Sequence, residues 1–90
     1  MPRPRRDAPS TFSADWPSAA CSDPDAEVLR RIAVNLRAAI GDRSLRSVAA
    51  DSGIHHSLVA KVLDGQAWVE VVTVARLERG LGARLWPDTE

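Results

Sequence analysis

The chain has 90 residues, and its 12 basic and 12 acidic side chains give a formal net charge of zero. A chain this short forms one small core, so multi-domain architectures and large barrels are excluded, and the overall charge favours neither a polyanion nor an anionic membrane. Aromatic residues make up only 4% of the chain against 44% hydrophobic residues. Cores with few rings are typical of packed helices, so the composition predicts an all-α protein.

Two further features bear on the cellular compartment. No stretch approaches the roughly 20 consecutive apolar residues that span a bilayer, and the N-terminus lacks the apolar run of a secretory signal. Cys21 is the only cysteine, so it can close no internal disulfide and forms no zinc half-site. We therefore expect a cytoplasmic protein.

Residues 1–24 differ in composition from the rest of the chain. They hold five of the six prolines and four serines, and they show no sustained period of 2 or 3.6. Such a segment buries too little apolar surface to offset its ordering entropy, so we expect a flexible N-terminal arm followed by one domain over 25–90. Phe12 and Trp16 are unusual in a flexible arm and could dock on the domain or on a partner.

Asp23-Pro24-Asp25 has the features of a helix start. Asp23 suits the N-cap, Pro24 suits the first helical position, and the acidic side chains face the positive end of the helix dipole. Apolar residues at helical spacing then continue until Gly41, namely Leu29, Ile32, Ala33, Leu36 and Ile40. The pattern predicts a helix from about 24 to 40.

Two shorter helices follow, separated by only three residues. The first begins after Ser44, a good N-cap, and ends at Gly53, whereas the second runs from about His56 to Asp64 and ends at Gly65. Two short helices joined by a turn of three or four residues containing Gly cross steeply. This is the helix-turn-helix arrangement.

The residues around the turn meet the steric requirements of that motif. Ala49 is small where the two helices approach most closely, and Gly53 stands where the turn needs a positive φ. Ile54 is the expected buried residue of the turn. Three valines complete the expected core of the motif, namely Val48, Val59 and Val62.

A fourth helix is predicted from about Val71 to Leu81. Val71, Val74, Ala75 and Leu81 are expected to cover the core beneath the motif. Gly80 lies inside this helix and is expected to cost it up to about 1 kcal/mol relative to Ala.

The remaining apolar residues lie outside the predicted helices. Trp68, in the loop before the fourth helix, is expected to pack as a lid on the core. Leu85 and Trp86 come too late in the chain for a large share of the core. This exposed pair therefore predicts a self-complementary dimer patch.

The segments Ser44–Gly65 and Val74–Gly82 resemble the Cro/C1-type (XRE-like) helix-turn-helix family of phage and bacterial repressors. The resemblance covers roughly residues 27–87, and Trp68 and Leu85-Trp86-Pro87 make it closest to short actinobacterial and actinophage members. It implies a compact bundle of four or five helices that binds operator DNA, usually as a homodimer. The departures from the family pattern are His55, where Ser or Thr commonly caps the helix, together with Val69-Glu70 and Gly80.

This resemblance implies that the second helix of the motif enters a major groove. The side chains able to reach base edges are His55, His56, Ser57, Ala60 and Lys61. Those expected against the phosphate backbone are Arg43, Ser44, Arg46 and Gln66. The arm could add phosphate or minor-groove contacts through Arg3, Arg5 and Arg6. Because histidines gain positive charge in mild acid, we expect tighter DNA binding at pH 6 than at pH 8.

Together these features predict a sequence-specific DNA-binding transcriptional regulator of the phage or prophage repressor or autoregulator type, a homodimer that is nucleoid-associated when bound. The alternative is an antitoxin or another protein-interaction module whose N-terminal arm binds a protein partner. A regulator should keep its DNA affinity without residues 1–20, whereas an antitoxin should lose its partner. Adjacent histidines on one helix chelate poorly and no nucleophile, base and acid converge, so we expect no metal, no cofactor and no enzyme.

The net charge of zero conceals an uneven distribution. Residues 28–61 carry six basic and two acidic side chains, whereas the segments before and after them are each acidic overall. Positive charge therefore gathers around the motif. We expect DNA binding that is sensitive to salt and has modest nonspecific affinity.

Overall fold

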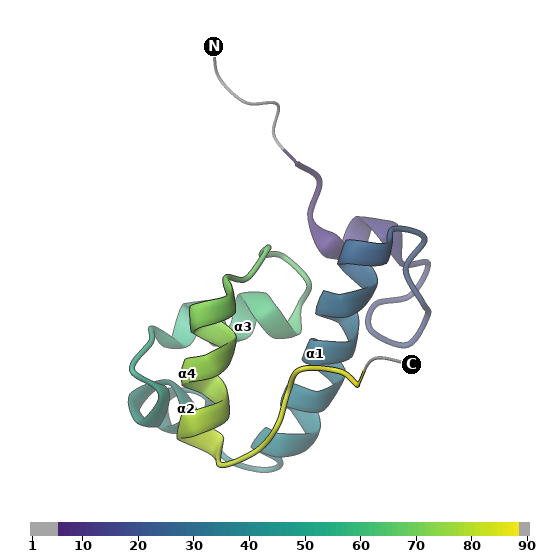
Figure 1. Cartoon of the computed structure of the whole chain (residues 1–90). Coiled ribbons are helices and arrows are strands. Elements are labelled where there is room, and N and C mark those ends of the chain that lie inside the picture. Colours follow the sequence, from purple (N-terminus) through teal and green to yellow (C-terminus); the bar gives the residue numbers. More distant parts are fainter. Residues whose placement is uncertain (1–5, 89–90) are drawn as a thin grey trace.

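Four α-helices and one short 3-10 turn make up the regular structure of residues 6–88, the part of the chain that the computed structural model describes. The elements are η1 (Pro9–Phe12), α1 (Pro24–Ile40), α2 (Leu45–Ser52), α3 (His56–Leu63) and α4 (Val71–Leu81). α4 packs along α2, and α3 contacts both α2 and α1 (Figure 1). The predicted all-α bundle is confirmed. None of these helices is long and apolar enough to cross a membrane.

The predicted helix ends follow from local capping chemistry. The carboxylate of Asp23 accepts a hydrogen bond from the backbone N–H of Ala26, and the hydroxyl of Ser44 accepts one from the N–H of Ser47. Gly53 ends α2 in the left-handed region at φ 70°. These groups satisfy backbone donors and acceptors that a helix leaves open at its ends, so the helix-turn-helix lies where the sequence predicts it.

The hydrophobic core lies where all four helices meet. Ile32 and Leu36 of α1, Val59 of α3 and Leu77 of α4 have no exposed surface. The whole cluster is Ile32, Leu36, Ile40, Val48, Ala49, Val59, Val62, Leu63, Val74, Leu77 and Leu85. The predicted core positions of the motif all belong to it, while Ile54 of the turn is only partly buried against it.

The buried face of α4 differs from the prediction at its first residue. Val71 was expected to cover the core, but it is 70% exposed. Val74 and Leu77 are buried instead, and Leu81 packs against the cluster at the next turn. Spacings of three and four keep these three residues on one face, whereas Val71 lies in the first turn, beyond the reach of the core.

Gly80 is required by packing, which corrects the expectation that it only weakens α4. A Cβ at this position would lie 2.8 Å from the Cα of Ser52 and 2.9 Å from the carbonyl carbon of Asp51. Both atoms belong to the backbone of α2, which cannot move aside without shifting the whole helix. The missing side chain therefore allows α2 and α4 to approach closely, as small residues do at helix crossings.

The chain after α4 returns to α1, so the predicted dimer patch is wrong for Leu85 (Figure 1). The Leu85 side chain is fully buried. Its carbonyl accepts a hydrogen bond of 2.9 Å from Nδ2 of Asn35, and its N–H donates to Glu78 at 2.7 Å. These bonds hold the segment in place. The prediction failed because a residue late in the chain can still enter the core when the chain folds back.

The segment before α1 is also folded, although its composition predicts a flexible arm. Residues 6–23, which we call the N-terminal strap, include η1, and η1 packs against α1. Within the strap, the Ser22 N–H donates to the Phe12 carbonyl at 2.9 Å. A Pro-rich segment without periodicity can become ordered when its backbone groups and a few aromatic side chains find partners, and composition does not report such partners. Residues 1–5 lie outside the described part.

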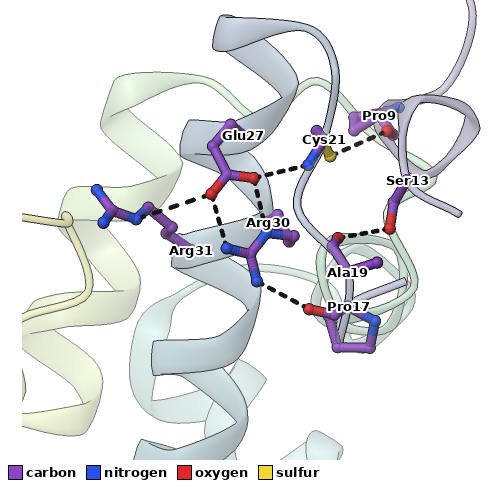
Figure 2. A network of polar contacts seen from close by, with 8 residues as sticks. All are labelled: Pro9, Ser13, Pro17, Ala19, Cys21, Glu27, Arg30 and Arg31. Carbon is purple, nitrogen blue, oxygen red and sulfur yellow. Dashed lines mark hydrogen bonds and ion pairs between the residues drawn. The ribbon is translucent and has the colours of Figure 1, made fainter. Parts of the chain in front are cut away.

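Glu27 fastens the strap to α1 (Figure 2). Its carboxylate accepts two hydrogen bonds from Arg30, of 2.7 and 2.6 Å, and a third of 2.9 Å from the N–H of Cys21. Arg30 also donates to the carbonyl of Pro17 at 3.0 Å. The hydrogen bonds from Arg30, and then the one from Cys21, lower the pKa of Glu27 to about 2 despite an opposing effect of burial.

Gly80→Ala is expected to lower the free energy of unfolding by about 1–3 kcal/mol, the usual cost of overpacking. Urea denaturation followed by circular dichroism measures this. Ala38→Gly on the exposed face of α1 is the control, and it should cost about 1 kcal/mol because helix propensity favours Ala. A more stable Gly80→Ala variant would contradict the close approach of α2 and α4.

The Glu27 network should make stability depend on pH in the acid range. Its pKa of about 2 lies below the usual value of 4.5, so its stabilising contribution is complete above about pH 4.5 and is lost as the pH falls towards 2. Urea titrations at pH 5.5, 4 and 3 should show a steeper loss for the wild type than for Glu27→Gln. Glu70→Gln, at an exposed residue that makes no cap hydrogen bond, should behave as the wild type.

Candidate nucleic-acid interface

The helix α3 has one apolar face in the core and one polar face outside. Its buried residues are Val59, Val62 and Leu63. Among the residues predicted to contact bases, His55, Ser57 and Lys61 are exposed, and His56 and Ala60 are partly buried. The structure thus brings these five residues together on and just before α3, on the side away from the core.

His55 caps α3 with its ring, so the departure from Ser or Thr at this position keeps the capping function. Its Nδ1 accepts a hydrogen bond of 3.1 Å from the Ser57 N–H and lies 2.8 Å from the Ser57 hydroxyl. Accepting the N–H requires an unprotonated Nδ1, so the neutral ring carries its proton on Nε2. A second proton, on Nδ1, would remove this acceptor.

The neighbouring His56 has a different environment. The rings of His55 and His56 are stacked, with 4.3 Å between their centroids. Burial, followed by the electrostatic effects of Arg46 and His55, lowers the pKa of His56 from its usual value of 6.5. Its positive charge therefore appears at lower pH than for an ordinary histidine, and the gain in binding predicted between pH 8 and pH 6 becomes smaller.

The predicted phosphate contacts at the start of α2 fall into two groups. Arg43 is held within the protein, because its guanidinium pairs with Asp51 and donates to the Ser47 hydroxyl at 3.0 Å. Ser44 is exposed but uses its oxygen as the cap of α2. Arg46 is exposed and makes no ion pair with any residue of 6–88. Of the two arginines, Arg46 is therefore the stronger candidate for a phosphate contact.

The C-terminal end of α3 carries the remaining predicted phosphate contact. Gln66 is exposed, and its backbone N–H donates to the Lys61 carbonyl at 2.9 Å. This bond fixes Gln66 beside the last turn of α3, close along the chain to Lys61. The side chains of Gln66, Lys61 and Arg46 are thus all presented to solvent around the motif.

Arg6, predicted to contact DNA, lies against Trp68 instead. Its guanidinium carbon is 3.6 Å from the centroid of the indole ring, and it forms an ion pair of 3.3 Å with Asp25. Trp68 is not a lid on the helical core, because its ring packs on the strap and its Nε1 donates to the Asp7 carbonyl at 2.8 Å. Arg3 and Arg5 lie outside the described residues.

Sequence reasoning missed the contact of Trp16 with α3. The Nε1 of Trp16 donates a hydrogen bond of 2.8 Å to the carbonyl of Leu63, 47 residues away. No periodicity or spacing reports a contact between such distant residues. The only signal was the presence of a tryptophan in a segment that otherwise has the composition of a flexible arm.

Two solved structures have a similar fold. The restriction-modification controller protein C.AhdI from Aeromonas hydrophila matches with a TM-score of 0.57 and 28% sequence identity, over 62% of this chain and 88% of that one. The hypothetical transcription factor NHTF from Neisseria matches with a TM-score of 0.62 and 15% identity, over 79% and 82%. No protein-family model and no curated protein matches the sequence. The fold is therefore that of helix-turn-helix transcription regulators.

His55→Ala should destabilise the protein by about 1 kcal/mol, because it removes the cap of α3. His55→Ser replaces the ring nitrogen by a hydroxyl group that can also cap the helix, so it should retain most of the stability that the Ala variant loses. Thermal unfolding at pH 7.5 measures both variants. Equal losses for the Ala and Ser variants would show that the ring contributes by packing and not as a cap.

Proposed function

We propose that the protein is a sequence-specific DNA-binding transcriptional regulator that reads the major groove with α3. The observation that carries this proposal is that α3 is amphipathic within the helix-turn-helix. Its apolar residues belong to the core, while its outer face presents His55, His56, Ser57, Ala60 and Lys61. A helix held in this way can insert its outer face into the groove without disturbing the core.

The chemistry of the outer face suits base recognition. Lys61 can donate to the O6 and N7 atoms of guanine, and Ala60 offers a small apolar contact for a thymine methyl group. The neutral His55 directs its Nδ1 to the backbone, which leaves its Nε2–H as a donor for a base or phosphate. His56 and Ser57 can both donate or accept hydrogen bonds.

The start of α2 is the proposed contact with the DNA backbone. Arg46 is exposed there, and backbone N–H groups at a helix start attract anions. Residues 28–61 carry six basic and two acidic side chains, although the formal net charge of the whole chain is zero. Of the other predicted contacts, Ser44 and Gln66 are exposed and are retained in the proposal, whereas Arg43 must first release Asp51.

The finer proposal is a repressor or autoregulator of the phage or prophage type that binds as a homodimer. The likeness to a restriction-modification controller protein supports a small regulator, and the resemblance to short actinobacterial and actinophage members rests on the sequence. With Leu85 buried, Trp86 is the remaining member of the dimer patch at 42% exposure. Trp86 lines one surface hollow, and Val34, also 42% exposed, lines another that shares Asn35, Pro87 and Asp88 with it.

The alternative of an antitoxin whose N-terminal arm binds a protein has less support. It needs Phe12 and Trp16 to be available to a partner, but the Trp16 indole donates to Leu63 and Phe12 makes an edge contact with Trp68. Both rings are therefore engaged within the chain. This alternative would be supported if a protein copurified with the full chain and no longer did so after deletion of the strap.

Selection of duplexes from a random library tests the proposal directly. The wild type should enrich one sequence, and a palindromic sequence is expected for a two-fold dimer. Absence of any enrichment would contradict DNA reading, and an asymmetric single site would contradict the homodimer.

Alanine variants then test the individual contacts. Lys61→Ala should lower the affinity for the selected duplex by about 1–3 kcal/mol if Lys61 contacts a base. Arg46→Ala should weaken binding to all duplexes and reduce the slope of log affinity against log salt by about 1. Arg79→Ala, at an exposed arginine of α4, is the control and should change neither quantity. Fluorescence anisotropy at several salt concentrations measures all three variants.

Binding should also strengthen as the pH falls below 6.5. The pKa of His56 lies below this value in the free protein, and a nearby phosphate favours the protonated ring. We expect little change from pH 8 to 7 and tighter binding at pH 5.5 than at pH 7. His56→Gln should remove most of the increase, and an unchanged increase in this variant would exclude His56 as its source.

A further inference from the structure

One of the hydrogen bonds at the C-terminal end of α3 comes from a residue far away in the sequence. The last four carbonyls of any helix lack partners within it. In α3, the carbonyls of 60, 61 and 62 accept from the N–H groups of Asp64, Gln66 and Gly65, at 2.9, 2.9 and 3.3 Å. The fourth, on Leu63, accepts from the indole Nε1 of Trp16 at 2.8 Å. The strap thus completes the end of α3.

The Trp16 ring also fills a space that only glycine leaves open. A Cβ on Gly65 would lie 2.5 to 2.8 Å from three atoms of the indole. The ring is thus pressed against the backbone of the turn that ends α3. Beside it, the Ser10 N–H donates to the Gly65 carbonyl at 2.9 Å. Two groups of the strap therefore bind two carbonyls at this turn, those of 63 and 65.

The other side of the strap is fastened to α1. The residue after Trp16, Pro17, accepts a hydrogen bond from Arg30, and Arg30 is in turn held by the Glu27 carboxylate (Figure 2). The N–H of Cys21 donates to the same carboxylate. A continuous set of polar contacts therefore joins α1 through the strap to the end of α3.

We propose that Trp16 is a positioning residue for DNA reading, a role that rests on the proposed function and assigns part of its specificity to the strap. By binding the Leu63 carbonyl and the Gly65 backbone, Trp16 fixes the angle of α3 relative to α1. Lys61 and Gln66 are near this end, so the angle sets where their side chains meet DNA. Removal of residues 1–20 would therefore weaken specific binding, contrary to the expectation from the sequence.

Amide hydrogen exchange tests the positioning itself, without DNA. Trp16→Phe keeps a ring against Gly65 and removes only the indole N–H. We expect the amides of residues 60–66 to exchange about fivefold faster, as the loss of one hydrogen bond predicts, with unchanged exchange in the middle of α1. Val72→Ala is the control, because this side chain of α4 is 56% exposed, and it should leave exchange at 60–66 unchanged.

Binding measurements test the consequence for specificity. For Trp16→Phe, the ratio of affinities for the selected duplex and for a random duplex should fall about fivefold. The salt dependence should stay unchanged because the phosphate contacts remain. Gly65→Ala, which both crowds the ring and strains a backbone at φ 68°, should lower the same ratio.

The outcomes separate the two proposals. Unchanged exchange in Trp16→Phe, or equally faster exchange throughout α1 and α3, would overturn the positioning role, since the second result describes a general loss of stability. An unchanged affinity ratio with locally faster exchange would also overturn it. If the wild type enriches no duplex, the proposed function fails and the role in DNA reading fails with it, while the exchange result still decides whether Trp16 fixes the end of α3.

Discussion

An isolated helix of eight residues is not stable in water, and this constraint governs the arrangement around α3. Its inner face is buried with α1, α2 and α4, its first turn is capped by His55, and its last carbonyl is bound by Trp16. Three different parts of the chain thus provide what the helix lacks. Apart from the ring of His55, the outer face takes no part in this support, which leaves its side chains available for recognition.

The features that could be predicted from the sequence are those with local causes. The helix ends at Asp23, Ser44 and Gly53 are of this kind. The side chains of Asp23 and Ser44 and the backbone N–H of Gly53 form hydrogen bonds within four residues of their own positions. Leu85 was misjudged, and the docking of Trp16 could not be located on α3, because their partners lie far along the chain and no local pattern reports how the chain returns. The positions of the candidate base contacts followed from the motif, whereas their hydrogen bonds, such as the ring cap of His55, required the fold.

The close approach of α2 and α4 explains why Gly80 differs from its expected role. Helix propensity, measured on isolated helices, ranks Gly80 as unfavourable, yet the same residue permits the contact between α2 and α4. Packing between helices therefore outweighs the preference of a single helix at this position.

The ring of His55 serves two purposes at once. One nitrogen supports the first turn of α3, and the other remains a donor for the proposed contact with DNA. During evolution, a substitution at this position that altered the preferred base would also alter the stability of the helix. Only residues that cap, such as Ser, Thr, Asn and Asp, could replace it without such a loss. The position is thus free to acquire new binding preferences only within a small set of side chains.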